Sequence, residues 1–153
     1  MLADVLGYRR IFNKKSVSNW GTKNAPGLTL NLQKSTSIRC CGRAFQFPDD
    51  FAHRQEVRQY LHGREGCDPV ELPIQLEDGE EVRGLVYVYK GTNVINPEPS
   101  LEEKVAMIVV AAKGTHGTGF DYISGLAEGL SKLGINDPAV DELWLAVRER
   151  RLA

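Results

Sequence analysis

The hydrophobic periodicity of this chain changes along its length, and this change limits the folds that the chain can adopt. In several segments before Ser100, apolar residues alternate with polar ones, which is typical of half-buried strands. After Ser100, apolar residues recur every three or four positions, as they do on the buried face of a helix. One helical segment interrupts the strands. This order predicts an α+β fold in which helices pack around a small mixed or antiparallel sheet that curls toward a barrel.

The predicted strands are recognised by alternation or by β-branched and aromatic residues, with turn residues between them. Lys34 to Ser37 predicts a turn, and Asp78-Gly79 is a strong hairpin signal. Asn13 to Gly27 predicts a long loop, and loops of this length are often functional. The expected strands are residues 5–12, 28–32, 38–47, 72–76 and 82–89.

Four predicted helices are marked mainly by their capping residues. Pro48-Asp49-Asp50 opens the first helix, Ser100 with Glu103 forms a capping box for the second, and Asp137-Pro138 opens the fourth. Gly134 closes the third helix, which follows an interhelical loop at residues 114–119. The faces expected to be buried are His53, Val57, Tyr60 and Leu61; Leu101, Val105, Ile108, Val109 and Ala112; Ile123, Leu126, Leu130 and Leu133; and Val140, Trp144 and Val147.

Charge is distributed unevenly between the two ends of the chain. Residues 1–44 hold eight basic side chains and one acid, net +7, whereas residues 45–153 hold 11 basic and 19 acidic side chains, net −8. A basic segment suits either a nucleic acid or a small anionic ligand. Because no cluster of aromatic residues offers a stacking surface for bases, neutralisation within one domain is favoured over nucleic-acid binding.

Length and cysteine content limit the class of protein further. The 153 residues are enough for one domain with a real core, so we expect a single domain over residues 1–153. No apolar run is long enough to span a bilayer, and the first residues do not resemble a secretion signal. Three cysteines, two of them adjacent, argue against a disulfide scaffold. We therefore expect a cytoplasmic protein with no membrane partner.

Candidate chemical groups are few. His53, His62 and His116 are scattered and no Cys-x-x-Cys occurs, so no metal site is expected. Cys67 is the only candidate nucleophile, and an incidental thiol is the favoured interpretation. Glu65 lies where a helix ends and the chain turns toward the sheet. The negative end of a helix dipole disfavours a carboxylate's ionised form, which would suit a general base, although a solvated glutamate is favoured from the pattern alone.

A series of motifs runs in order over nearly the whole chain. Gly7-Tyr8-Arg9-Arg10-Ile11-Phe12, Ser16, Gly21-Thr22 and Pro26-Gly27 come first, and Cys41-Gly42-Arg43-Ala44-Phe45 follows. Tyr60-Leu61 with Arg64-Glu65, the segment from Val82 to Val88, Asp121-Tyr122-Ile123 with Leu126-Ala127-Glu128, and Leu133-Gly134-Ile135 complete the series. No single motif is decisive, but the ordered set resembles the ChaC-like gamma-glutamylcyclotransferases of the glutathione-specific branch.

This resemblance implies both a fold and a reaction. The fold is a small curled sheet with helices packed around it. The reaction, that of a lyase, converts glutathione or another gamma-glutamyl peptide to 5-oxoproline and releases the amine portion, which is Cys-Gly for glutathione. The substrate's own α-amine attacks its γ-carbonyl, so the enzyme holds the chain curled and moves protons. The resemblance implies no cofactor, no metal and no nucleic-acid partner; it does not fix the oligomeric state or choose between gamma-glutamyl substrates.

Site residues follow from the resemblance by position. Glu65 matches the family's catalytic glutamate, which acts as general base and general acid. Tyr122 matches a tyrosine that lines the substrate site, and Arg10, Ser16 and Thr22 match residues near the pocket. Glu71, on the following strand, is a distant second candidate for the base.

Three departures from the family's pattern leave an alternative open. The chain has no Tyr-Gly pair, so the family's first strand and its Tyr-Gly-Ser-Leu loop are lacking, and we expect a domain that is N-terminally incomplete relative to the family. Asn19-Trp20 stands where His-Arg is frequent, and Gly66-Cys67-Asp68-Pro69 replaces Gly-Gly-Tyr. The alternative is a non-catalytic, truncated homologue that binds a gamma-glutamyl ligand or a protein partner.

Overall fold

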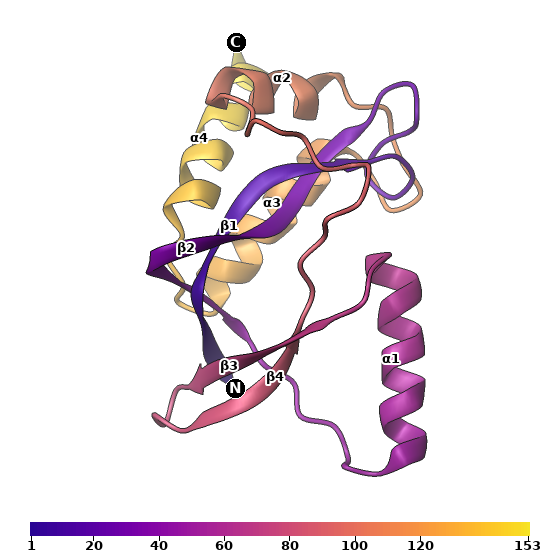
Figure 1. The fold of residues 1–153 in the computed structure, drawn as a ribbon. Coiled ribbons are helices and arrows are strands. Elements are labelled where there is room, and N and C mark those ends of the chain that lie inside the picture. The colour runs from indigo at the N-terminus through magenta and orange to yellow at the C-terminus, as the bar shows by residue number, and fades with distance from the viewer. The chain divides into compact units, whose positions relative to one another are not determined.

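The computed structural model describes residues 1–153 and contains four strands and four helices, in the order β1, β2, α1, β3, β4, α2, α3, α4 (Figure 1). The strands are β1 (Leu2–Ser16), β2 (Gly27–Arg43), β3 (Val70–Leu76) and β4 (Glu81–Val86). The helices are α1 (Phe51–Glu65), α2 (Leu101–Val110), α3 (Gly119–Lys132) and α4 (Pro138–Leu152). The predicted α+β class is confirmed. The elements follow the predicted order, except that the two strands predicted at residues 28–32 and 38–47 form the single strand β2.

The strands form one four-stranded sheet in the order β2-β1-β3-β4. Strand β3 is antiparallel to β1, with Ala3 opposite Leu76, and antiparallel to β4, with Val70 opposite Val86. The β3–β4 turn contains Gly79, whose φ of 89° is a conformation that favours glycine. The hairpin predicted from Asp78-Gly79 is therefore confirmed, although β4 ends at Val86 rather than at Tyr89.

The turn predicted at Lys34 to Ser37 is wrong, because β2 continues through it as one strand from Gly27 to Arg43. This segment contains neither glycine nor proline, and an edge strand tolerates exposed polar side chains without turning. In β1, Gly7 has a φ of 75°, and a Cβ there would lie 3.8 Å from the Ser35 carbonyl oxygen. Strand β1 also runs on to Ser16, so the predicted loop begins later than Asn13.

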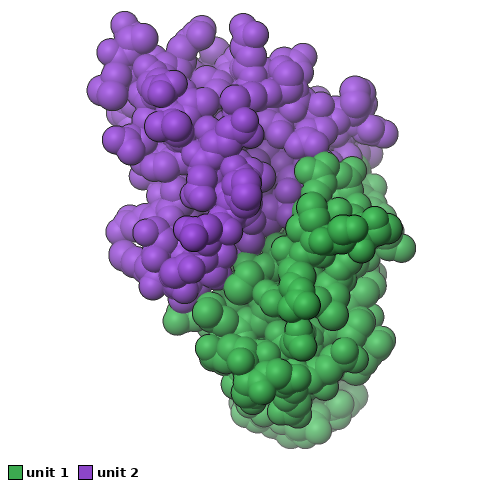
Figure 2. All heavy atoms as spheres, turned by 90° about the vertical axis from the view of Figure 1, so that its left-hand side faces the viewer, with its two compact units in different colours: residues 1–9, 32–91 green, residues 10–31, 92–153 purple.

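The chain divides into two compact units, which Figure 2 colours separately. Unit 1 comprises residues 1–9 and 32–91, and unit 2 comprises residues 10–31 and 92–153. Strands β1 and β2 each contribute residues to both units. The single domain expected over residues 1–153 stays a prediction.

Unit 2 contains the largest fully buried side chains of the protein. Helix α4 packs against α2 and α3. The buried side chains come from all three helices and from the shared strands: Ile11, Phe12, Leu28, Val105, Ile108, Ile123, Leu130, Val140, Leu143 and Val147. The predicted helical faces are thus confirmed in large part. Leu101 and Val109 are errors, since they are 37% and 51% exposed, and Leu143 is buried on α4 where the pattern had placed Trp144.

Helix α1 in unit 1 departs from its predicted packing, because none of its residues is buried. Val57 and Leu61 are half-buried, whereas His53 and Tyr60 are exposed. The predicted helix start is confirmed, since the Asp50 side chain accepts a 3.0 Å hydrogen bond from the His53 amide. The helix ends at Glu65, and Gly66 follows with a φ of 71°. None of the four helices meets the length and apolarity that a bilayer crossing requires.

Candidate active site

The predicted site residues fall in both units. Glu65 belongs to unit 1, whereas Arg10, Ser16, Thr22 and Tyr122 belong to unit 2. Each group is therefore described within its own unit.

Glu65 is the last residue of α1, immediately before the glycine that ends the helix. Its side chain is 33% exposed, and its Oε1 lies 3.4 Å from the Arg64 Nε. The Gly66 amide donates to the His62 carbonyl, which closes the last turn of the helix. The helix end thus fixes the backbone of Glu65, while its side chain stays partly exposed to solvent. A carboxylate in this setting can accept and return a proton.

Tyr87, which follows β4, is a residue that the sequence motifs did not single out. Its hydroxyl is buried and has no hydrogen-bond partner. Burial raises the pKa of Tyr87 above its ordinary value, and the negative charges of Glu65 and Cys67 raise this pKa further. The alternation of Val82 to Val88 predicted a strand, but nothing in the sequence showed that this hydroxyl would be buried.

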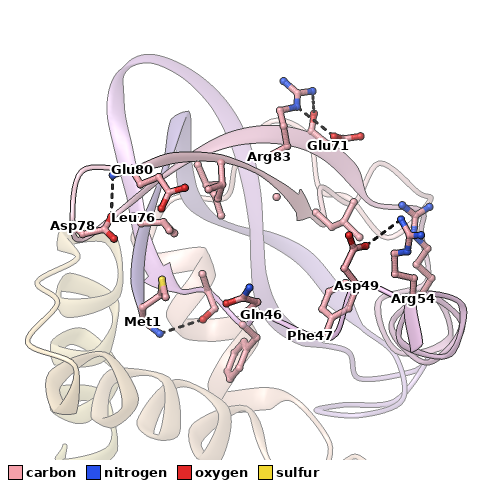
Figure 3. A pocket seen from close by; sticks show the side chains of 17 residues that line it. Met1, Gln46, Phe47, Asp49, Arg54, Glu71, Leu76, Asp78, Glu80 and Arg83 are labelled. Atoms are coloured by element: carbon pink, nitrogen blue, oxygen red, sulfur yellow. Dashed lines mark hydrogen bonds and ion pairs between the residues drawn. The ribbon is translucent and has the colours of Figure 1, made fainter. Parts of the chain in front are cut away.

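Unit 1 also contains a groove of about 620 Å³, between the segment of residues 44–49, α1 and the β3–β4 hairpin (Figure 3). Two ion pairs line the groove: Arg54 lies 3.4 Å from Asp49, and Arg83 lies 3.4 Å from Glu71. Glu71, the second candidate base, lines this groove, whereas Glu65 does not. The two candidate bases thus have different surroundings, and Glu71 is held by an arginine on the neighbouring strand.

In unit 2, Tyr122 on α3 is bonded to the backbone of β2. Its hydroxyl oxygen accepts a 2.9 Å hydrogen bond from the Leu30 amide. Helix α3 is fixed at its start by a capping box in which Thr118 and Asp121 bond each other's backbone amides. The hydrogen bonds from the Thr118 backbone and hydroxyl lower the pKa of Asp121. The cap thus fixes the start of α3, and the Leu30 bond ties the Tyr122 hydroxyl to β2.

The Ser16 side chain holds the loop that follows β1, because its Oγ accepts a 3.0 Å hydrogen bond from the Trp20 amide. The Trp20 ring then packs on the Tyr122 ring, with centroids 5.3 Å apart, and on the His116 ring at 5.8 Å. The structure thus brings Ser16 and Tyr122 together through Trp20. Sequence reasoning noted Trp20 only as a departure from the family motif, because a single tryptophan in a loop does not indicate what it contacts.

Two loops that looked unrelated in the sequence meet at this point. The Thr115 and His116 amides donate to the Ser18 and Asn19 carbonyls, at 2.9 and 2.8 Å. The backbone around Asn19 and Trp20 is so close to Gly114 and Gly27 that neither position has room for a Cβ. A Cβ on Gly114 would lie 2.4 Å from the Asn19 oxygen, and one on Gly27 would lie 2.2 Å from the Trp20 oxygen. The glycine-rich loop at residues 114–119 therefore serves as a close support for the loop that follows β1.

Thr22 and Arg10 have local structural partners in the same unit. The Thr22 Oγ1 accepts a 3.2 Å hydrogen bond from the Ala25 amide, which closes the turn before Pro26-Gly27. Arg10 forms a 2.8 Å ion pair with Asp137, the N-cap of α4, and both side chains are largely buried. The placement of both residues near a substrate stays a prediction. No group of three or more His, Cys, Asp or Glu side chains has a geometry that could hold a metal ion.

Comparisons with known proteins bear on this arrangement. The ChaC-like protein family model matches residues 1–150. Gamma-glutamylcyclotransferase 2-3 of Arabidopsis thaliana is 30% identical over 94% of this chain and 76% of its own length. The glutathione-specific gamma-glutamylcyclotransferase of Escherichia coli K12 is 26% identical over 95% of this chain, which spans only 63% of that relative's length.

The fold has counterparts among solved structures. A yeast gamma-glutamyl cyclotransferase specific to glutathione superposes with a TM-score of 0.77 at 21% identity, covering 97% of this chain and 87% of that one. A second structure of the yeast enzyme superposes with a TM-score of 0.74 at 21% identity, covering 99% and 90%. These likenesses confirm the fold class. Since the family model extends over almost all residues described above, the chain belongs to the ChaC-like family.

Proposed function

We propose that this protein is a gamma-glutamylcyclotransferase whose substrate is glutathione. The observation that carries this proposal is the match to the ChaC-like family over residues 1–150, together with curated relatives that are named for this activity. The net charge of +7 in residues 1–44 suits an anionic tripeptide.

The proposed reaction needs no water and no external nucleophile. The α-amine of the gamma-glutamyl group attacks the γ-carbonyl of the same group, and a new C–N bond closes a five-membered ring. The amide C–N bond to cysteine then breaks, which yields 5-oxoproline and Cys-Gly. The α-ammonium nitrogen loses two protons on becoming the ring N–H, and the leaving nitrogen gains two on becoming the ammonium group of Cys-Gly, so a single carboxylate can relay protons from the first nitrogen to the second.

Glu65 is the residue that we propose for this proton transfer. It is the last residue of α1, and one third of its side chain is exposed, so an ammonium group can approach the carboxylate. Glu71 is less suitable, because Arg83 donates both to its carboxylate and to its backbone carbonyl. Intramolecular attack requires mainly that the substrate be held in a curled conformation, so binding residues are expected to contribute as much as the base.

The binding residues that we propose come from unit 2. Tyr122 offers a hydroxyl whose oxygen is fixed by the Leu30 amide. Ser16 and Thr22 shape the loop after β1 through their bonds to Trp20 and Ala25. Arg10 precedes this loop in the sequence and pairs with Asp137. We include it among the binding residues because of its match to the family motif.

The substitution Glu65→Gln tests the proposal, because it keeps the shape of the side chain and removes the group that accepts the proton. Purified protein is incubated with millimolar glutathione, and 5-oxoproline and Cys-Gly are measured by mass spectrometry. We expect product formation to fall at least about 100-fold, the usual contribution of a general base. Circular dichroism should show an unchanged fold.

The matched control is Glu56→Gln, the same substitution at an exposed position of the same helix, which should retain full activity. Retained activity in Glu65→Gln would exclude Glu65 as the base, and loss in Glu71→Gln instead would identify the second candidate. If the wild-type protein binds glutathione but forms neither product, the non-catalytic alternative is correct and the proposed activity is wrong.

A further inference from the structure

The loop after β1 presents an aromatic side chain that the proposed mechanism does not use. Trp20 is half-buried, and its ring packs on those of Tyr122 and His116. The interplanar angle with Tyr122 is 55° at a centroid distance of 5.3 Å, which is the tilted arrangement that aromatic pairs favour. Trp20 thus contacts the residue that we propose as part of the substrate site.

The backbone of Trp20 is held on both sides. Its amide donates to the Ser16 Oγ at 3.0 Å, and its carbonyl lies so close to Gly27 that a Cβ there would approach to 2.2 Å. Its ring is also confined, since a Cβ on Gly117 would lie 3.1 Å from the Trp20 Cζ3. A side chain confined in this way has little freedom to adapt, so it imposes a position on its neighbours.

Of the two rings that Trp20 contacts, that of Tyr122 carries a hydroxyl that we propose for substrate binding. Its ring meets Trp20, and its hydroxyl oxygen accepts from the Leu30 amide of β2. The Leu30 hydrogen bond sets the distance of the oxygen from β2, whereas the Trp20 ring limits the swing of the phenol ring about that bond. Both restraints are needed to fix a phenol hydroxyl that rotates about two side-chain torsions.

We propose that Trp20 is a positioning residue that holds the Tyr122 hydroxyl in place for the gamma-glutamyl substrate, with Ser16 anchoring Trp20. This inference rests on the proposed function for its catalytic consequence, but its structural part is testable without any substrate. In this proposal Ser16 acts indirectly: it fixes the backbone of Trp20, and the Trp20 ring in turn fixes the ring of Tyr122.

The structural part is tested by hydrogen exchange at the Leu30 amide, the donor to Tyr122. Trp20→Ala should speed Leu30 exchange by up to about tenfold relative to amides of α4, because an aromatic pair contributes up to roughly that factor to an equilibrium. Tyr122→Phe removes the hydrogen-bond acceptor and should speed Leu30 exchange at least as much as Trp20→Ala. Trp20→Phe keeps an aromatic ring and should retain most of the wild-type protection. Ser16→Ala should give a Leu30 exchange rate between those of Trp20→Phe and Trp20→Ala.

Trp144→Ala is the matched control. Trp144 packs on Phe120 with centroids 5.4 Å apart and an interplanar angle of 51°, nearly the geometry of the Trp20–Tyr122 pair, and it lies in the same unit. Its removal should leave Leu30 exchange unchanged relative to the amides of α3. Unchanged Leu30 exchange in Trp20→Ala, alongside faster exchange in Tyr122→Phe, would overturn the proposal. Unchanged exchange in Tyr122→Phe would overturn it too.

The catalytic part is tested by kinetics on glutathione. Trp20→Ala should raise KM about five- to tenfold with kcat changed less than about twofold, since a misplaced binding group weakens ground state and transition state alike. Trp20→Phe should return KM close to that of the wild type. A fall in kcat with unchanged KM would contradict the positioning role. If the wild-type protein does not turn over glutathione, the proposed function fails, whereas the exchange experiment still decides whether Trp20 positions Tyr122.

Discussion

The polar atoms around Glu65 and Tyr122 are arranged differently in the two units. In unit 2, the Tyr122 hydroxyl and the Ser16 Oγ each accept a hydrogen bond from a backbone amide. In unit 1, the Tyr87 hydroxyl is buried without a partner. A buried hydroxyl that loses its bonds to water without a replacement destabilises the folded state, so Tyr87 is retained at some loss of stability.

Tyr87→Phe should therefore raise the free energy of unfolding, by about 1 kcal/mol at pH 7. The raised pKa of Tyr87 adds a pH dependence, since the folded protein keeps a proton that the unfolded chain loses above the ordinary value of 10.0. The stability of the wild-type protein should fall as the pH rises from about 10 through the folded-state pKa, and the variant should lack this loss. Denaturant unfolding at pH 7 and at about pH 10.5 measures both effects.

Tyr60→Phe is the comparison for this experiment, because Tyr60 is 66% exposed. It should change stability by less than about 0.5 kcal/mol at either pH. A loss of stability in Tyr87→Phe would show that its hydroxyl makes a favourable interaction after all.

Residue-level prediction from sequence succeeded where a role depends on local backbone chemistry. Ser100 and Asp137 were predicted as helix caps, and each accepts the expected amide hydrogen bonds. The helix start predicted at Pro48-Asp49-Asp50 proves to be capped by Asp50. The pairing of Trp20 with Tyr122 was not predictable, because it joins positions far apart in the chain whose contact depends on tertiary packing. The burial of the Tyr87 hydroxyl was hidden for the same reason.

At the scale of elements, α4 is anchored to strand β1 by a largely buried ion pair. Asp137 caps α4 by accepting from the Ala139 and Val140 amides, and its other oxygen lies 2.8 Å from the Arg10 guanidinium. The two side chains are 15% and 11% exposed, so their charges depend on each other. One aspartate thus joins a helix start to a strand.

Asp137→Ala should lower the free energy of unfolding by about 3 kcal/mol, because it removes both a helix cap and the carboxylate that pairs with a largely buried guanidinium. Asp137→Asn keeps a capping oxygen and should lower it less. Thermal or denaturant unfolding measures both variants. Lys132→Gln, which breaks the exposed pair with Glu128, should shift stability by less than about 0.5 kcal/mol. If Asp137→Ala proves as mild as Lys132→Gln, the ion pair does not anchor α4.

Helices and turns were predicted well where the sequence carries strong local signals. The extent of a strand and the buried face of a helix were predicted poorly, because they depend on which residues become buried. The Asp78-Gly79 hairpin and the three C-terminal helices are confirmed, since turn glycines and capping residues act locally. The extent of β2 was missed, because serine and threonine occur both in turns and in edge strands. The face of α1 was misjudged, because the spacing of Val57 and Leu61 does not say whether anything covers them.

At the scale of the whole molecule, the chain combines the ChaC-like family fold with a shorter length than its curated relatives. Both compact units contain parts of β1 and β2, and the proposed catalytic and binding residues are divided between the units. The α+β class and the family were both predictable, since the motifs follow one order along the whole chain.

The central claim is that the substrate's own amine is the nucleophile, and isotope labelling tests it most directly. Wild-type protein is incubated with glutathione in ¹⁸O-labelled water, and the products are analysed by mass spectrometry. Intramolecular cyclisation predicts 5-oxoproline without ¹⁸O, formed in equal amount with Cys-Gly. Glutamate that carries ¹⁸O in its γ-carboxylate would show that water attacks instead, and would contradict the account.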